Sequence, residues 1–290
     1  MSAKRLKGRM YPIYFMIPAL VIYIVIFIIP TFSSFFYSFT KWTLTDWDFI
    51  GWDNYKTFFS EPSLRIGLKN TLIYGFGTSF GKVVIALLLA VLLTKGLKIQ
   101  GYLRTVIFFP TLLSALAVGF TFKSLMHPTT GLINTALGAL GAGSIHWLTN
   151  EKIALFSVMG IDIWKGLGVA TLIYITGIQS IPKDYYEAAK IDGASGGQSF
   201  RFITLPLIRT AMNSVITLSL IGGLRNFDLV YSTTGGGPGF ATELMTTVTY
   251  RMFAAGLYGL STVGNVVLFL IITAIAFPLY GYLGKKEVEM

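Results

Sequence analysis

Residues 187–206 read EAAKIDGASGGQSFRFITLP and form a polar stretch between two long apolar parts of the chain. Just before it, Ser180 can cap a helix whose first turn contains Pro182, a position where proline is tolerated because early amides lack helical partners. We expect this helix to run to about Asp192. Gly193 follows directly, and glycine is the residue best suited to the positive φ that ends many helices. The pattern predicts a helix that stops in a sharp turn.

A second helix is expected after this turn. Ser195 and Gln198 have the three-residue spacing of a capping box, in which each side chain binds the backbone amide of the other residue. Pro206 cannot donate a backbone hydrogen bond and disfavours the helical conformation of Leu205, so we expect the helix to end there. Residues 182–206 are therefore predicted to form helix, turn and helix.

The chain as a whole is strongly apolar. Of 290 residues, 53% are hydrophobic and 12% are charged, about half the charged share of a typical soluble domain. A helix needs about 20 apolar residues to cross the ~30 Å hydrocarbon core of a bilayer, and six runs approach that length. We therefore predict an all-α membrane protein with six transmembrane helices, near residues 13–39, 71–93, 105–122, 153–178, 208–224 and 260–283.

Basic residues predict the orientation of these spans. With a cytoplasmic N-terminus, the inner segments hold 13 Lys or Arg in 58 residues and the outer segments hold 8 in 93. The positive-inside rule favours this arrangement, with both termini in the cytoplasm. A secretory signal is disfavoured because the first apolar run is too long and no small-residue cleavage site follows it. The net charge of +10 is dispersed over span ends, which argues against nucleic acid binding.

Residue types for catalysis or metal binding are sparse. The only two histidines, His127 and His146, are expected in an outer loop without an acidic cluster, where exposed or capping roles are typical. Residues 193–197 match the G-x-S-x-G pattern of hydrolases, but a helix precedes them and no histidine follows. The sequence has no cysteine and no phosphate-binding G-x-x-x-x-G-K-[ST] motif. We expect no catalytic residue, metal site or cofactor on this chain, and another chain must hydrolyse any ATP that drives it.

The first helix of the polar stretch has a narrow, weakly apolar face. Its members recur at a spacing of three to four residues and are Ile181, Tyr185, Ala188 or Ala189, and Asp192. Alanines allow close approach to another surface, whereas a helix bound to lipid carries larger apolar side chains. This face favours docking in a groove of a protein, with an interfacial helix on lipid headgroups as the alternative.

The polar stretch resembles the EAA loop of the membrane subunits of ATP-binding-cassette (ABC) importers. The matching positions are Glu187, Ala188, Ala189, Asp192, Gly193, Ala194, Phe200, Ile203, Leu205 and Pro206. Further stretches are similar to the carbohydrate-uptake branch of that family, at residues 109–111, 131–134, 147–148, 163–166, 227–229 and 234–239. The likeness covers most of the chain after the first span.

The resemblance implies a type I importer permease of the bacterial or archaeal cytoplasmic membrane. It implies a single permease domain over 1–290, with a core at about 68–284 and a cytoplasmic coupling loop at 182–206. The implied partners are a second permease subunit that forms a heterodimer with this one, a dimer of ABC ATPases that holds ATP and Mg, an extracytoplasmic sugar-binding protein, and membrane lipid.

In such subunits the EAA helix inserts into a cleft of the ATPase. By match of position, Glu187 would pair with a basic residue there, and Ala188 and Ala189 would give close contact. Asp192 belongs to the same coupling segment, and Gly193 would turn the chain. The resemblance also places residues 233–239, by default a flexible outer loop, near the docking surface of the binding protein.

A neutral sugar needs planar hydrogen-bonding groups for its hydroxyls and aromatic faces for its C–H surfaces. Candidates are Asn226 and Asp228 near span ends, and Trp164, Tyr174 and Asn213 within spans. Asn226 is favoured because it resembles a cavity-lining position of the carbohydrate branch. For the aromatic candidates, packing or anchoring at the membrane interface is the more usual role.

Three charged residues, Lys82, Asp162 and Lys165, are expected at membrane depth, where each costs about 2.5–3.5 kcal/mol on insertion scales unless paired or hydrated. Asp162 and Lys165 are three residues apart and can neutralise each other, whereas Lys82 has no evident partner. These residues are either structural or border a water-filled path.

The sequence leaves two alternative functions. One is an ion-coupled secondary transporter that uses Asp162 as its carrier, although the inverted halves typical of that class are not found. The other is a membrane enzyme, for which the sequence offers no catalytic constellation.

Overall fold

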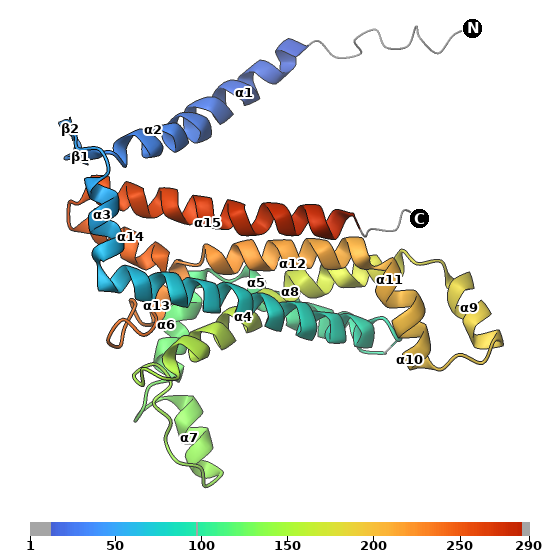
Figure 1. The fold of residues 1–290 in the computed structure, drawn as a ribbon. Coiled ribbons are helices and arrows are strands. Elements are labelled where there is room, and N and C mark those ends of the chain that lie inside the picture. The colour runs from blue at the N-terminus through green and yellow to red at the C-terminus, as the bar shows by residue number, and fades with distance from the viewer. Residues whose placement is uncertain (1–12, 97, 286–290) are drawn as a thin grey trace, which may run out of the picture.

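The computed structural model describes residues 13–96 and 98–285. The predicted cytoplasmic segments 1–10 and 286–290 lie outside the described residues. Within the described part the chain is mostly helical (Figure 1).

The N-terminal part is a long helical stretch followed by a small ribbon. The stretch consists of η2 (Ile13–Met16), α1 (Ile17–Tyr23), η3 (Ile24–Ile28) and α2 (Ile29–Tyr37). The antiparallel ribbon pairs β1 (Thr40–Trp42) with β2 (Trp47–Phe49).

The next helices are α3 (Asp53–Ser60), α4 (Pro62–Leu93), α5 (Gln100–Leu112), α6 (Ala115–Leu125), α7 (Leu132–Ala139) and α8 (Ala154–Gln179). They are followed by α9 (Lys183–Ile191), α10 (Gly196–Ser199), η4 (Phe200–Thr204), α11 (Leu205–Leu207) and α12 (Arg209–Leu224). The last helices are α13 (Asp228–Thr233), α14 (Met245–Ala254) and α15 (Tyr258–Gly284).

The predicted spans are all helical. Four helices are long and apolar enough to cross a membrane, namely Tyr14–Tyr37, α4, α8 and α15. Two bent pairs, α5 with α6 and Gly196–Leu207 with α12, raise the number of candidate spans in the described chain to as many as six if each pair forms one span. The predicted helical membrane fold is thus confirmed, with four to six candidate spans in the described residues.

Two spans differ from the expected single helix. The span at 105–122 divides at Leu113 and Ser114, whose backbones are extended, and α5 and α6 meet there at 99°. Pro110 lies in the last turn of α5 and lacks an amide donor, which weakens the helix just before this break. The span at 208–224 is bent by 70° from the helix before it.

Close helix contacts hold the bundle together. Helices α4, α8 and α12 pack against one another, with α5 on α8 and α15 on both α12 and α14. At two crossings a glycine is required: a Cβ on Gly223 would lie 2.7 Å from Thr78 Oγ1, and one on Gly177 would lie 2.7 Å from the Cβ of Ala211. Small residues at crossings are typical of membrane bundles, where close packing replaces the hydrophobic driving force.

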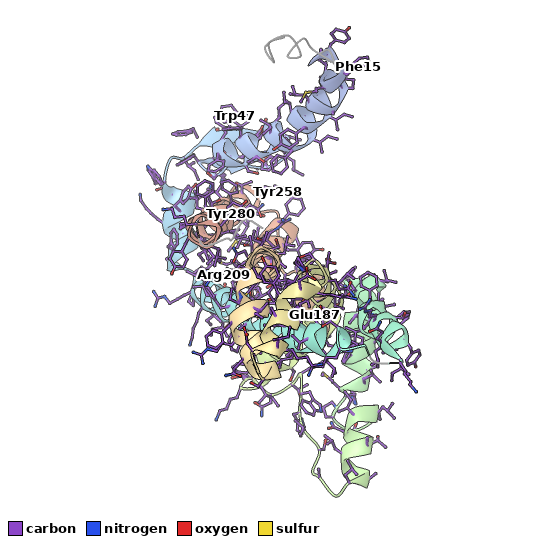
Figure 2. The ribbon with its side chains drawn as sticks, turned by 90° about the vertical axis from the view of Figure 1, so that its right-hand side faces the viewer. Phe15, Trp47, Glu187, Arg209, Tyr258 and Tyr280 are labelled. Atoms are coloured by element: carbon purple, nitrogen blue, oxygen red, sulfur yellow. The ribbon has the colours of Figure 1, made fainter. Side chains whose placement is uncertain are left out.

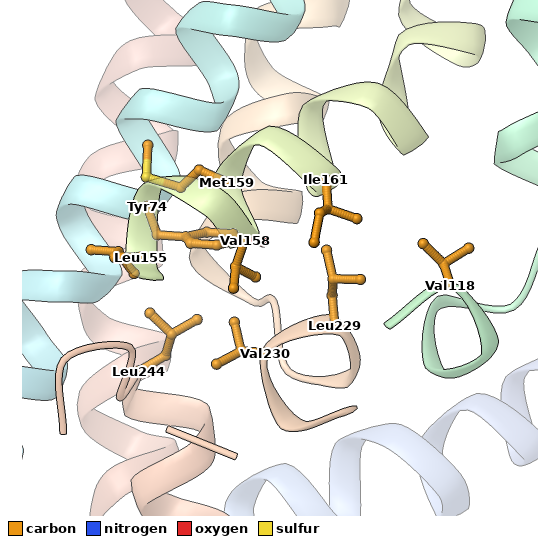
Figure 3. Close-up of a cluster of buried hydrophobic side chains, with 9 residues drawn as sticks. All are labelled: Tyr74, Val118, Leu155, Val158, Met159, Ile161, Leu229, Val230 and Leu244. Carbon is orange, nitrogen blue, oxygen red and sulfur yellow. The ribbon is translucent and has the colours of Figure 1, made fainter. Parts of the chain in front are cut away.

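Three clusters of buried apolar side chains lie within the bundle. One joins α4, α6, α8 and α13 and contains Tyr74, Val118, Leu155, Val158, Met159, Ile161, Leu229, Val230 and Leu244 (Figure 3). A second lies where α8 and α12 approach α9, and includes Tyr174, Ile181 and Ile208. The third packs α3 and α4 against α14 and α15.

The first span diverges from this bundle in Figure 1. No residue in its most apolar window is buried within the chain, and α2 contacts α15 through an edge-to-face pair of Phe35 and Phe269 at 5.8 Å. The N-terminal end of α1 and the C-terminal end of α15 lie away from α3, on the side of the molecule that carries α9.

Candidate functional site

Helix α9 lies at one end of the molecule and projects from the bundle (Figure 1). None of its residues is buried; Glu187 and Ala188 are exposed and Ala189 is half-buried. Figure 2 looks at this end of the molecule and labels Glu187. Two apolar side chains of the helix are also exposed, Tyr185 at 51% and Ile191 at 86%. The helix therefore presents an uncovered, partly apolar surface beside its acidic residue.

The start of α9 differs from the prediction. Pro182 occupies the N-cap position, and the hydroxyl of Ser180 instead donates to the carbonyl of Gly177 at 2.8 Å. The prediction of a Ser180 cap is wrong because Ser180 still belongs to the end of α8. At the other end, Asp192 is the C-cap and Gly193 has φ +77°, so the predicted turn is confirmed.

The second helix begins as predicted and ends later. Ser195 N donates to Gln198 Oε1 at 2.7 Å and Gln198 N donates to Ser195 Oγ at 3.3 Å, which completes the capping box. The prediction that Pro206 ends the helix at Leu205 is wrong, because Leu205 is helical with φ −61° and ψ −42°. A wider π-helical turn, η4, precedes the proline, and the helix breaks only at Ile208.

Both helices of this segment are attached to the spans beside them. The hydroxyl groups of Tyr186 in α9 and Thr204 in η4 are hydrogen bonded at 2.9 Å. Ile181 and Ile208, just before α9 and α12, are 5% and 1% exposed and belong to the same apolar cluster. Helix α9 is therefore joined to α8 and α12 through short, packed connections.

A buried polar cluster lies between α4, α8 and the end of α12. Lys82 Nζ donates to Asp162 Oδ2 at 2.7 Å, and Asn226 Nδ2 lies 3.4 Å from Asp162 Oδ1. The prediction that Lys165 neutralises Asp162 is wrong, because Asp162 faces α4 and its ion pair is with Lys82. In the described chain, Lys165 makes no ion pair.

A small cavity lies beside Lys82, at one side of this cluster. Gly166 makes room for Lys82, since a Cβ at Gly166 would lie 2.6 Å from Lys82 Cε. A cavity of about 140 Å³ is lined by Lys82, Gly166 and Ser219 among others. Within the described residues, Asn226 Oδ1 and the Tyr74 hydroxyl are buried without a hydrogen-bond partner. Neither residue is among those that line this cavity, but buried polar atoms without a partner are unusual and mark the surroundings of Asp162 as a candidate site for hydroxyl groups.

The other candidates are scattered over the bundle. Tyr174 is fully buried in the apolar cluster near α9, and Asn213 donates to the carbonyl of Leu283 at 3.1 Å. Trp164 is 41% exposed and contacts Phe122 edge to face at 5.3 Å. Asp228 is exposed in the first turn of α13. Of the five path candidates, only Asn226 contacts the charged cluster.

The glycine-rich loop at 233–239, predicted to be flexible, is held to its surroundings by hydrogen bonds. The Thr242 hydroxyl lies 2.7 Å from that of Thr234 and donates to the carbonyl of Gly237 at 2.6 Å. Asn70 of α4 donates to the carbonyl of Ala241 at 3.0 Å.

The two histidines have local capping roles, with His127 Nδ1 2.9 Å from the hydroxyl of Thr130.

Glu243 closes this loop and is 2% exposed. Burial raises the pKa of its carboxyl above the ordinary value, and the opposing effects of Arg251 and of the Thr247 hydroxyl are smaller. A raised folded-state pKa means that the carboxyl stabilises the fold below its unfolded-state pKa. This contribution is lost as the pH rises through the folded value.

We expect the Glu243→Gln variant to lose this pH dependence. Hydrogen exchange of residues 233–243 in the wild-type chain should slow as the pH falls from about 7 toward 4, after correction for intrinsic rates, whereas the variant should change little. The same substitution at exposed Glu61 is the control. Parallel pH profiles for the wild type and the Glu243 variant would contradict the assignment.

The described residues hold no group of three His, Asp or Glu side chains suited to a metal ion.

Over residues 69–288 the chain matches the family described as binding-protein-dependent transport system inner membrane component. It is 32% identical to the probable ABC transporter permease protein YurN of Bacillus subtilis, over 97% of this chain and 99% of that one. It is also 31% identical to the trehalose/maltose transport system permease protein MalF of Thermococcus litoralis, over 89% of each chain.

The fold likewise matches a solved transporter. A chain in the crystal structure of a bacterial ABC transporter for the acidic polysaccharide alginate superposes with a TM-score of 0.84, at 21% identity and over 94% of this chain and 95% of that one. The likeness of fold agrees with the match of sequence over most of the chain. The protein therefore belongs to the binding-protein-dependent inner membrane components and is a multi-pass, non-catalytic permease subunit of an ABC importer.

Proposed function

We propose that this permease carries a sugar or oligosaccharide into the cell. Several relatives support this substrate class by name: the multiple sugar-binding permease MsmF of Streptococcus mutans, MalF of Thermococcus litoralis, and the arabinooligosaccharide permease AraP of Bacillus subtilis. An extracytoplasmic binding protein delivers the sugar, a second permease subunit completes the path in a heterodimer, and an ATPase dimer supplies the energy.

The single observation that best supports the coupling mechanism is the geometry of α9. An exposed helix with small residues at Ala188 and Ala189 is joined to the bundle by a tight turn at Gly193 and by packed ends. In the proposal, Glu187, Ala188, Ala189 and Asp192 enter a cleft of the ATPase. Closure of the ATPases moves α9, and the rigid connections transmit that motion to α8 and α12. The loop 182–206 and both termini are then cytoplasmic, with the core at about 68–284.

The proposed sugar path passes the charged cluster. Asn226, Asp162 and Lys82 present donors and acceptors at membrane depth, and Lys82 also lines the cavity of about 140 Å³, a setting suited to sugar hydroxyls. Asp228 and Trp164 are exposed and would make secondary contacts with the sugar. Tyr174 and Asn213 are not retained, because one is enclosed in an apolar cluster and the other binds the end of α15.

The energy source is tested by uptake of labelled sugar in cells. Depletion of ATP with the proton gradient held constant is expected to stop transport. Collapse of the gradient with ATP maintained should leave most of it. Uptake that survives the loss of ATP and follows the gradient would overturn ATP-driven import.

Gly193→Val is expected to weaken association with the ATPase. A β-branched residue at φ +77° strains the backbone, at a cost of about 1–3 kcal/mol, so α9 would leave its orientation. Co-purification of the ATPase should fall about tenfold while membrane insertion is retained. Gly197→Val is the matched control, since Gly197 lies in α10, has open space around it and lacks a positive φ. Equal co-purification of the two variants would contradict the role of this turn.

A further inference from the structure

A second cavity of about 240 Å³ lies between α4, α5 and α8, away from the charged cluster. Its lining is mostly apolar and includes Leu93, Ile107, Phe108, Leu172 and Ile175. At ~30 Å³ per water molecule, the volume is that of about eight waters, but an apolar cavity offers few partners to hold them. An apolar chain is a better match for this lining than water.

One charged residue, Arg104, also lines the cavity. Its Nη2 donates to the carbonyl of Leu93 at the end of α4, at 3.2 Å. Its Nε is buried and has no hydrogen-bond partner within the described chain, and the same holds for Thr171 Oγ1 in the lining. Buried donors are normally paired, so these atoms indicate a missing acceptor.

The charges around Arg104 favour an anion. The connection from α4 to α5 carries Lys95 and Lys98, both exposed, and no Asp or Glu occurs from residue 94 to 104. The lining of the cavity contains no acidic residue either. A guanidinium that follows two exposed ammonium groups along the chain, with no acidic residue between them, suits a phosphate, which Arg can bind through two parallel hydrogen bonds.

The cavity has a defined depth in the membrane. The end of α4 and the α9–α10 turn line a common hollow, so Lys95 and α9 are on the same side of the membrane. With the proposed orientation, this side faces the cytoplasm. Toward the middle of the membrane the helices close again, since a Cβ on Gly168 would lie 2.8 Å from Phe108 Cα. A ligand with a phosphate at Arg104 and an apolar tail in the cavity would lie as an inner-leaflet lipid does.

We propose that this cavity is a binding site for one anionic phospholipid of the inner leaflet. Its phosphate binds Arg104, while Lys95 and Lys98 of the α4–α5 connection add positive charge on the same side of the membrane, and one acyl chain enters between α5 and α8 beside Thr171 and Leu172. Basic pockets between membrane helices on the cytoplasmic side are suited to such headgroups. The site is independent of the sugar proposed above.

The test uses the assembled importer, delipidated in detergent and then mixed with phosphatidylglycerol or phosphatidylcholine of identical chains. Native mass spectrometry should detect one tightly held phosphatidylglycerol per copy of this chain. Arg104→Gln should weaken its binding about tenfold or more, because a charge-assisted contact is lost. Arg65→Gln removes the same charge from an exposed position at the other end of α4 and should have no effect.

A second variant tests the cavity without changing charge. Leu172→Trp should expel the acyl chain and reduce retention to the level of Arg104→Gln, whereas Leu88→Trp, at another exposed position, should not. Three results would overturn the proposal. They are equal retention by the Arg104 variant, equal retention of phosphatidylcholine, and displacement of the lipid by millimolar glycerol phosphate, which would indicate a site for free phosphate.

Discussion

The Glu187→Lys variant is expected to abolish ATP-driven uptake while the chain still inserts and folds in the membrane. Glu187 is exposed at the middle of α9 and makes no ion pair with the described residues, so its charge is not needed within this chain. In the proposed complex it faces a basic residue of the ATPase. Reversal of its charge places two positive charges together. Their repulsion costs several kcal/mol, which weakens association more than a hundredfold.

Two measurements separate this effect from misfolding. Gel filtration of the purified variant should show an unchanged monodisperse peak, and co-purification of the ATPase should fall to background. The control is Asp48→Lys, the same charge reversal on exposed strand β2 at the opposite end of the molecule. Normal uptake by the Glu187 variant would contradict a role of α9 in coupling. Loss of uptake with an intact complex would show that Glu187 acts after the complex has assembled.

The coupling segment was predictable from sequence because its geometry is local. The turn at Gly193 and the capping box of Ser195 and Gln198 depend on residues within three positions of one another. The predicted helix limits at Ser180 and Pro206 were wrong because they do not depend on local residues alone. Each depended on how the neighbouring helix continues: α8 extends to Gln179, and a π-helical turn carries the second helix past the proline.

The charged cluster could not be assigned in the same way. Lys82 and Asp162 are 80 residues apart, and their contact depends on which faces of α4 and α8 meet. Sequence spacing offered Lys165 as a partner, but three residues along a helix allow contact without requiring it. A usable signal was present: Lys82 had no partner within its own span, and Asp162 was the one acidic residue in the predicted spans. The bend between α5 and α6 was likewise missed, since apolar composition alone does not distinguish a straight span from a broken one.

The Lys82→Met variant is expected to destabilise the bundle strongly. The side chains of Lys82 and Asp162 are 9% and 12% exposed, so the substitution leaves a buried carboxylate with only a long contact to Asn226. Breaking one side of a buried ion pair costs about 3–5 kcal/mol. Thermal unfolding of the detergent-purified complex should show a clear fall in Tm. Lys165→Met on the same helix as Asp162 is the control and should change Tm little, because Lys165 has no ion pair in the described chain.

The double variant Lys82→Met with Asp162→Asn distinguishes a structural pair from a pair that also lines the path. It removes both charges with little change of volume and keeps an amide within reach of Asn226, so most of the lost stability should return. Uptake should not return with it. A carboxylate accepts a sugar hydroxyl through a charge-assisted bond, and its loss should slow transport about tenfold at equal protein level. If uptake recovers together with Tm, the pair only holds α4 against α8, and the sugar path must lie elsewhere in the bundle.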